Sequence, residues 1–290
     1  MRHALVISAL SLILLSGATP TSAQLVLPGA VAPTAEGAPG ASEVPAKDNR
    51  PKPHKRSAEA ADTVASPPPA KVPRIESLAG QTLYRDGGGS EISFALRDKA
   101  LVVSRLTLAG RGDDGAECRI DVADLPLSVR DEGRPDGMAR IGIALPACPI
   151  SFDVMDGAAL ETGDRAACAF KEAHCTVDPT GLWGPPASSL TPARDKTIER
   201  ERARAEAAVR ASFKRLVATT KDRPTIMSYA REQAQFSSTR EETCRGYAGE
   251  LKHGFCSTRV TEARAASLHA KADLAQAEKD KRRNRRSPPD

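Results

Sequence analysis

The region that most constrains the fold lies near the C-terminus, where side chains recur at helical spacing on both sides of a glycine-rich break. Before the break, four residues are three or four positions apart: Gln233, Phe236, Arg240 and Cys244. After it, helical spacing relates Cys256, Val260, Thr261, Arg264 and Leu268. Such spacing keeps side chains near one face of an α-helix. The pattern predicts two helices, with a cysteine at each end of the break where a disulfide would join them.

The whole segment 193–280 is predicted to be helical. A first helix is expected to begin after Thr191-Pro192 and to end near Thr220, and Pro224 marks the start of a second. The third is expected to begin near Cys256. The apolar stripe of the first helix comprises Ile198, Ala205, Val209, Phe213 and Leu216. Short connections between three helices favour a small antiparallel bundle.

Residues 79–164 show a different periodicity, because apolar and polar residues alternate in several short runs. Clear examples are Ile92, Phe94 and Leu96, and later Ile150, Phe152 and Val154. Glycine-rich segments separate the runs, which favours a small antiparallel β-sandwich or barrel. The predicted fold class is therefore α+β. Residues 165–192 are interpreted as a cysteine-bearing connector, in which Trp183 is expected to pack at the junction of the two modules.

The N-terminal 23 residues are typical of a secretory signal peptide. Arg2 and His3 precede an apolar run from Ala4 to Leu15, and Thr21-Ser22-Ala23 supplies a small-residue cleavage site before Gln24. Residues 24–78 are rich in Pro and Ala and are expected to be a disordered linker. No later segment is apolar enough to predict a membrane span. The expected location is periplasmic or secreted.

Six cysteines in an exported chain favour disulfides. Sequence proximity suggests three local pairs, although it does not fix the connectivity: Cys118 with Cys148, Cys168 with Cys175, and Cys244 with Cys256. Zinc is the competing interpretation, since His174 adjoins Cys175 and His253 lies near Cys256. Neither place has a paired C-x2-C spacing, so no metal or other cofactor is predicted.

The C-terminal pattern resembles the LprI-type lysozyme-inhibitor family over about residues 200–275. The hallmarks of that family, Gln-x2-Trp-x3-Arg-x3-Cys and Cys-x4-Thr-x2-Arg-x3-Leu, are matched by Gln233, Arg240, Cys244, Cys256, Thr261, Arg264 and Leu268. Phe236 replaces the Trp, and Glu241 replaces the Asp that commonly follows the Arg. The β-rich part resembles uncharacterised exported bacterial proteins. The resemblance implies a bacterial envelope protein and, as in some relatives, inhibition of lysozyme.

The matched residues themselves are interpreted as structural, because periodic positions on a buried helix face usually serve packing. Arg240 is expected to bond to Glu241 or to a helix terminus. The turn from Arg245 to Phe255 is the candidate inhibitory loop. Glu250 is the acidic group in it that is available for a basic enzyme.

Charge is distributed unevenly along the chain. Residues 78–164 carry nine basic and fifteen acidic side chains, whereas residues 165–278 carry nineteen basic and fourteen acidic ones. An acidic β-module can steer a cationic partner such as lysozyme or another envelope protein. The basic tail at residues 281–290 is expected to be disordered and suits anionic envelope polymers instead. Export argues against nucleic acid as its partner.

No sequence motif indicates catalysis. The histidines stand in no recognisable nucleophile or metal arrangement, and Asp113-Asp114 occupy a predicted turn. The sequence therefore predicts an exported, non-enzymatic protein. Two functions remain open: a lysozyme-inhibitor-like binding module that protects peptidoglycan, or an envelope structural protein that contacts surface polymers.

Overall fold

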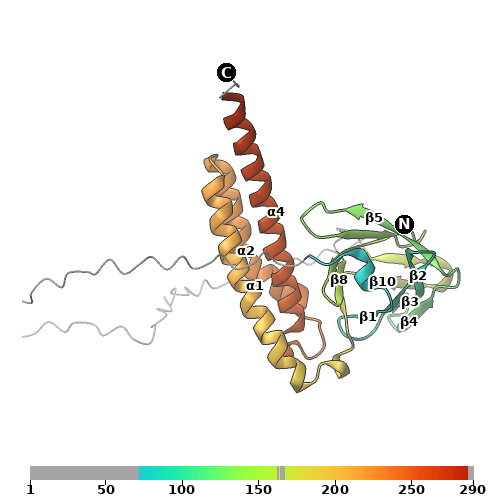
Figure 1. Cartoon of the computed structure of the whole chain (residues 1–290). Coiled ribbons are helices and arrows are strands. Elements are labelled where there is room, and N and C mark those ends of the chain that lie inside the picture. Colours follow the sequence, from blue (N-terminus) through green and yellow to red (C-terminus); the bar gives the residue numbers. More distant parts are fainter. Residues whose placement is uncertain (1–71, 162, 164–166, 287–290) are drawn as a thin grey trace, which may run out of the picture. The chain divides into compact units, whose positions relative to one another are not determined.

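The computed structural model describes residues 72–161, 163 and 167–286 (Figure 1). The predicted signal peptide, most of the predicted linker and residues 287–290 lie outside this part of the chain. The described residues belong to one compact unit with an α+β fold, which confirms the predicted fold class. No helix among them is long and apolar enough to cross a membrane.

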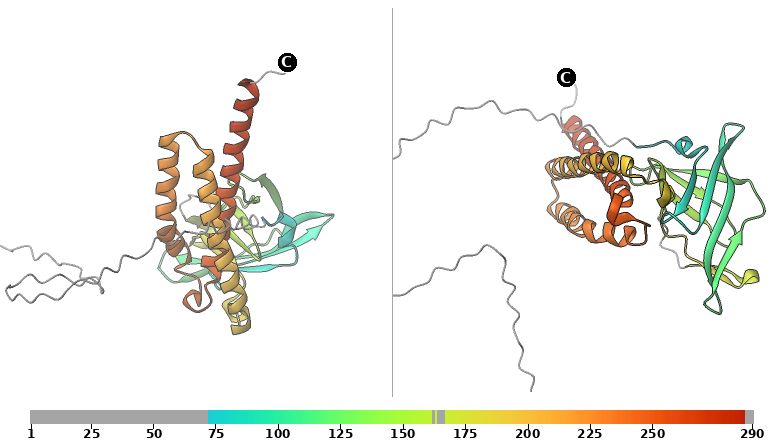
Figure 2. Two further views of the ribbon diagram at one scale, coloured as in Figure 1. Left: turned by 60° about the vertical axis from the view of Figure 1, so that its left-hand side comes forward. Right: turned by 90° about the horizontal axis from the view of Figure 1, so that it is seen from below.

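The β-part is a closed antiparallel barrel of eight strands (Figure 2). Around the barrel these strands follow the order β1, β2, β3, β5, β6, β7, β8 and β11, and β11 pairs with β1 to close it. The bounds are β1 Thr82–Arg85, β2 Glu91–Arg97, β3 Ala100–Gly112, β5 Leu127–Gly133, β6 Arg140–Ile143, β7 Ile150–Met155, β8 Ala158–Glu161 and β11 Gly181–Gly184.

Alternating apolar side chains fill the interior of the barrel. Phe94, Ile141 and Phe152 belong to one buried cluster, and the Trp183 ring meets the Phe152 ring edge-on with 5.5 Å between centroids. The indole Nε1 of Trp183 donates to the carbonyl oxygen of Pro179 at 2.9 Å, so the ring is buried with its polar atom satisfied. Trp183 therefore packs inside the barrel and not at a junction between modules. Leu96, expected in the alternating stripe, is about half exposed.

The segment predicted to be a connector is part of the sheet. Besides β11, it contains β9 Cys168–Phe170 and β10 Cys175–Val177, and β10 pairs with the end of β3. β4, Glu117–Asp121, also pairs with the second half of β3. Short 3-10 helices at Ile75–Leu78, Lys171–Ala173 and Ala187–Ser189 complete this part. Local sequence patterns did not predict these pairings, because the paired strands are far apart in sequence.

Three disulfides are present, but two of the proposed pairs are wrong. The structure joins Cys118 to Cys175 and Cys148 to Cys168, in place of Cys118 with Cys148 and Cys168 with Cys175. The cause is the sheet, because β10 and β4 both lie along β3 and bring Cys118 and Cys175 together. The third pair, Cys244 with Cys256, is confirmed.

The helical part contains four α-helices, one more than predicted: α1 Pro192–Thr219, α2 Arg223–Cys244, α3 Glu250–His253 and α4 Phe255–Arg286. The long helices α1, α2 and α4 lie side by side (Figures 1 and 2). Pro192 occupies the first turn of α1, and the Asp222 carboxylate accepts from the Thr225 amide at the start of α2. These are ordinary helix-start signals.

Both ends of the described chain are more regular than expected. α4 continues to Arg286, so the predicted disordered tail is helical for its first six residues. Residues 72–78, assigned to the linker, include a 3-10 helix whose Leu78 is fully buried in the barrel cluster. The folded part therefore begins before residue 78.

The barrel and the helices share a hydrophobic core. On β11, Trp183 points into the barrel while its neighbour Leu182 packs with Tyr247 and Phe255 of the helical part. This is the period-two alternation of a strand that is covered on both faces. Met138 and Met155 of the barrel join the same cluster. The two parts therefore depend on each other for burial of apolar surface.

Candidate functional site

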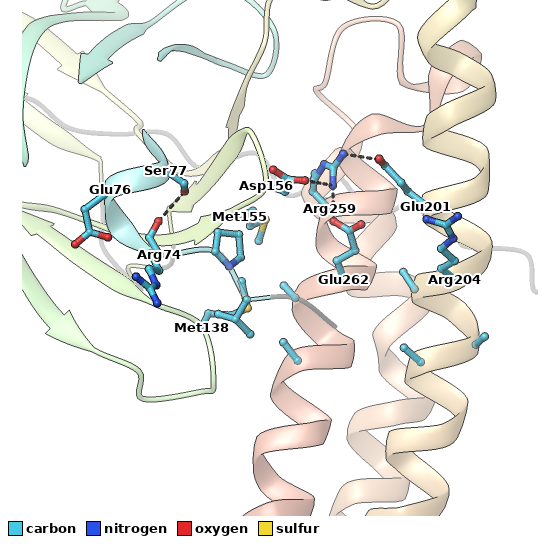
Figure 3. Close-up of a pocket in the computed structure, with 17 residues that line it drawn as sticks. Arg74, Glu76, Ser77, Met138, Met155, Asp156, Glu201, Arg204, Arg259 and Glu262 are labelled. Atoms are coloured by element: carbon cyan, nitrogen blue, oxygen red, sulfur yellow. Dashed lines mark hydrogen bonds and ion pairs between the residues drawn. The ribbon is translucent and has the colours of Figure 1, made fainter. Parts of the chain in front are cut away.

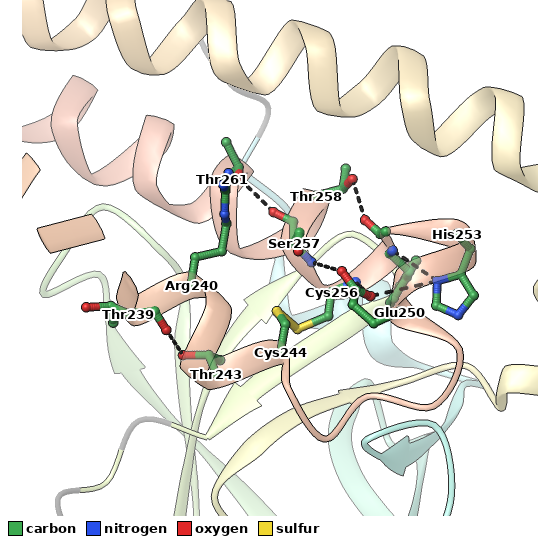
Figure 4. Close-up of a disulfide and its surroundings, with 12 residues drawn as sticks. Thr239, Arg240, Thr243, Cys244, Glu250, His253, Cys256, Ser257, Thr258 and Thr261 are labelled. Atoms are coloured by element: carbon green, nitrogen blue, oxygen red, sulfur yellow. Dashed lines mark hydrogen bonds and ion pairs between the residues drawn. A yellow bond between two sulfur atoms is a disulfide. The ribbon is translucent and has the colours of Figure 1, made fainter. Parts of the chain in front are cut away.

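Most of the residues that carry the family resemblance meet at the contact between α2 and α4. The Arg240 guanidinium donates from Nη1 to Thr261 Oγ1 at 3.1 Å (Figure 4). The same guanidinium lies 5.5 Å from the centre of the Phe236 ring. Arg240 thus bonds to a residue on the neighbouring helix instead of to Glu241 or a helix terminus as expected.

The other side of Phe236 is covered from α4. The Arg264 guanidinium lies 5.8 Å from the Phe236 ring centre, and its Nε donates to Gln233 Oε1 at 3.3 Å. Burial lowers the pKa of Arg264, and the nearby carboxylate of Glu232 opposes that shift. Leu268 is fully buried against α1. These positions are therefore packed between helices.

The candidate inhibitory loop is folded against its own protein. Both Glu250 carboxylate oxygens accept backbone amides at the start of α4, from Cys256 at 2.9 Å and Ser257 at 2.8 Å (Figure 4). His253 is buried, and the phenol of Tyr247 packs beside Phe255. Glu250 is consequently committed to capping a helix, and it is not the free acidic group that the sequence suggested.

A groove of about 1020 Å³ lies where the barrel, the segment 72–77 and helices α1 and α4 meet (Figure 3). Its apolar lining combines two methionines of the barrel with short side chains of the helices: Met138, Met155, Ala205, Ala207, Ala208, Ala263 and Ala266. Its charged residues are Arg74, Glu76, Asp156, Glu201, Arg204, Arg259 and Glu262. The volume is at the upper end of what small-molecule sites occupy.

Arg259 lies at the centre of the ion pairs at the charged end of this groove. It donates to Glu201 Oε2 and to Glu262 Oε2, both at 2.6 Å, and lies 4.0 Å from Asp156 Oδ2 (Figure 3). Its side chain is only 6% exposed and lies 5.1 Å from the Phe255 ring centre. Its Nε is buried without a hydrogen-bond partner among the described residues.

The ionisation of this cluster reflects both burial and crowding of carboxylates. Burial is the largest effect on Glu262 and raises its pKa; Arg259 opposes this, while Glu201 and Asp156 add to it. For Arg259, burial acts to lower the pKa, but Glu262 and Glu201 outweigh it and the net shift is upward. Both shifts follow from placing more carboxylates than guanidinium groups in a partly dry site.

Sequence reasoning missed this cluster. Asp156, Glu201 and Arg259 come from a barrel turn and two helices, and no local spacing relates them. A partial signal was present, because Arg259 and Glu262 are three apart on one helix and such pairs are neighbours.

The cysteines considered for zinc are oxidised. Cys175 and Cys256, the neighbours of His174 and His253, are each in a disulfide. In the described ranges, no group of three or more His, Cys, Asp or Glu side chains is placed to hold a metal ion.

Comparison with known proteins provided no relative for this chain. No protein-family model matches it, and no curated protein or solved structure does either.

Proposed function

We propose that this chain is an exported, non-enzymatic binding protein of the LprI type, and that its partner is a c-type lysozyme or another basic envelope protein. The observation that carries the proposal is the meeting of Gln233, Phe236, Arg240, Thr261 and Arg264 at one contact between α2 and α4. The residues that resemble a family motif in sequence are thus also in contact with one another in the fold. The three disulfides are typical of a protein that folds in an oxidising compartment, which supports a periplasmic or secreted location.

The acidic surface for such a partner has to come from outside the Arg245–Phe255 loop, because Glu250 is used as a cap. Asp131 and Glu132 at the end of β5 and Asp136 in the following turn are exposed; Asp136 is paired with Arg140 at 3.3 Å, and Arg134 is exposed beside them. Exposed carboxylates of this kind steer a cationic protein and raise its association rate more than its intrinsic affinity. We assign the approach of the basic partner to this β5–β6 end of the barrel.

The test is inhibition of cell-wall lysis by a c-type lysozyme, with the oxidised chain of residues 24–290 as the inhibitor. We expect dose-dependent inhibition that weakens when Asp131, Glu132 and Asp136 are changed together to Asn, Gln and Asn. A matched variant changes Asp98, Asp113 and Asp114 to Asn in other turns and should inhibit like the wild type. No inhibition by the folded wild-type chain would overturn the proposal.

Point variants are preferable to removal of residues 193–290. Met155, Ala158 and Leu182 of the barrel are buried in the core shared with the helices. Deletion of the helices would expose these side chains and destabilise the barrel. A loss of inhibition would then report unfolding instead of a lost contact.

A second candidate function rests on the end of α4. Lys279, Lys281, Arg282, Arg283 and Arg285 are exposed there on a regular helix. Such a concentration of positive charge favours anionic envelope polymers as partners, with binding that weakens as salt increases. Changing Lys281, Arg282 and Arg283 to Ser should abolish salt-sensitive binding to isolated envelopes. The same changes at Lys196 and Lys214 of α1 and at Lys221 in the connection between α1 and α2 should not.

A further inference from the structure

The groove around Arg259 has an apolar floor and a charged end of one dominant sign. We propose that it binds a small amphipathic cation, an alkylamine whose ammonium lies among Asp156, Glu201 and Glu262 and whose chain lies along the methionine- and alanine-lined floor. This proposal does not depend on lysozyme as a partner, because it rests on the groove alone.

The charge balance decides the sign of the ligand. Three carboxylates surround the single guanidinium of Arg259, which leaves a net charge of −2 at this end. Both terminal nitrogens of Arg259 are already bonded to Glu201 and Glu262. Asp156 lies 4.0 Å from the guanidinium and is 80% exposed, so it is the carboxylate least neutralised within the protein. An added cation would relieve the repulsion among these groups.

The other charged residues of the groove do not cancel this end. Arg74 and Glu76 belong to the opposite wall, and Arg204 lies one turn along α1 from Glu201 (Figure 3). Arg74 and Arg204 are exposed, and solvent therefore screens them more than it screens the partly buried carboxylates of Glu201 and Glu262. Arg74 and Arg204 are the groups that would hold an amphipathic anion instead. Titration with octanoate tests this alternative.

The carboxylates remain within reach of a small ligand. The side chains of Glu201 and Glu262 are 26% and 28% exposed, so they are recessed but not sealed. A thin ligand with one ammonium can approach them from the groove and donate up to three hydrogen bonds. Charge-assisted bonds of this kind are stronger than neutral ones.

The floor supplies the apolar part of the recognition. Met138 and Met155 are buried on the barrel side, and Ala205 and Ala208 of α1 and Ala263 and Ala266 of α4 line the helical side. Alanine side chains are short, and flexible methionines adapt their shape to a ligand. Burial of an alkyl chain here would raise the affinity in proportion to its length, by about fourfold per methylene in the fully buried limit.

The experiment titrates the oxidised chain of residues 24–290 with four probes by calorimetry and by amide chemical-shift mapping. The probes are octylammonium, octanoate, octanol and propylammonium, which separate charge from chain length. We expect saturable octylammonium binding at least about tenfold tighter than that of octanoate or propylammonium. The shifts should centre on residues of the groove. Octanoate binding as tight as octylammonium, or no saturable octylammonium binding, would overturn the proposal.

Two sets of variants test the two ends separately. The double variant Asp156→Asn with Glu201→Gln should weaken octylammonium binding about tenfold while octanol binding stays unchanged. Ala263→Met, which places a larger side chain in the floor of the groove, should weaken the binding of both octylammonium and octanol. The control is Asp98→Asn with Glu241→Gln, two exposed acids outside the groove. Unchanged octylammonium affinity in a folded Asp156→Asn, Glu201→Gln variant would contradict the assignment of the ammonium position.

Discussion

The hydroxyl of Tyr247 donates a hydrogen bond of 2.8 Å to the carbonyl oxygen of Pro185, and it thereby ties the loop after α2 to the chain just beyond β11. The ring of Tyr247 lies 5.6 Å from that of Phe255, and burial raises the pKa of its phenol. A second bond nearby runs from the Ala248 amide to the carbonyl oxygen of Asp86 at 2.8 Å. The loop suggested by the sequence as an inhibitory element is therefore a docking element between helices and barrel.

Tyr247→Phe removes this hydrogen bond but keeps the ring packing. We expect the free energy of unfolding to fall by about 1 kcal/mol, because the Pro185 carbonyl loses its protein donor in a partly buried place. Urea unfolding followed by circular dichroism measures the change. Equal stability of the two proteins would mean that water replaces the hydroxyl without cost.

Gly184→Ala tests the close approach of the two parts. A Cβ at this position would lie 2.7 Å from the Tyr247 hydroxyl oxygen and 2.9 Å from the Phe255 ring. We expect destabilisation of about 1–3 kcal/mol from overpacking. The control Gly88→Ala meets nothing within 4 Å. Combining Gly184→Ala with Tyr247→Phe should cost less than the sum of the two single changes, since one of the clashes is removed.

Glu250→Ala removes the carboxylate that accepts two amides at the start of α4. The expected loss is about 1 kcal/mol, as for other N-terminal capping residues, and Glu250→Gln should recover part of it. Thermal unfolding measures both. Glu241→Ala, an exposed site on α2, is the control. Unchanged stability together with lost lysozyme inhibition would restore Glu250 as a partner contact.

Glu232→Gln should reveal a pH-dependent contribution to stability. A hydrogen bond from Lys271 lowers the pKa of Glu232, with burial opposing and the charges of Lys271 and Arg264 assisting. A lowered carboxyl pKa stabilises the folded state above the unfolded pKa, and this contribution disappears as pH falls through the folded pKa. The side chain is 38% exposed, so we expect a deficit of only about 0.5 kcal/mol at pH 7. The deficit should vanish in acid; urea titrations at several pH values test this.

The disulfides should differ in their contribution to stability. Cys118 and Cys175 are 57 residues apart in sequence, whereas Cys244 and Cys256 are 12 apart. From the loop lengths, replacing both cysteines by Ala should cost about 4 kcal/mol for the first pair and about 3 kcal/mol for the second. Guanidinium unfolding of the double variants compares them. Peptide mapping without reduction checks the pairing, and a Cys118–Cys148 peptide would contradict the structure.

Local patterns were sufficient for the long helices. Ile198, Val209 and Leu216 recur on one face of α1, and all three are buried as predicted. The same reasoning placed Cys244 and Cys256 at adjacent helix ends, because the break between them is short and rich in glycine. The short helix α3 was missed, since four residues carry too little periodicity to distinguish a helical turn from a loop.

Strand alternation predicted the β-rich module but not its closure. Runs such as Ile150–Val154 indicated strands, whereas the three strands after residue 167 are only three or four residues long. Which strand each of these joins depends on partners far along the chain. The assignment of residues 165–192 to a connector and two wrong disulfide pairs have this common cause.

The sequence by itself determined the three long helices, the alternating strands and one disulfide, because each depends on residues near one another in the chain. Tertiary structure alone decided that Trp183 lies inside the barrel and that Tyr247 docks on β11. It also brought Asp156, Glu201 and Arg259 to one groove. These relationships depend on contacts between distant segments, and such contacts form only when the whole core is buried together.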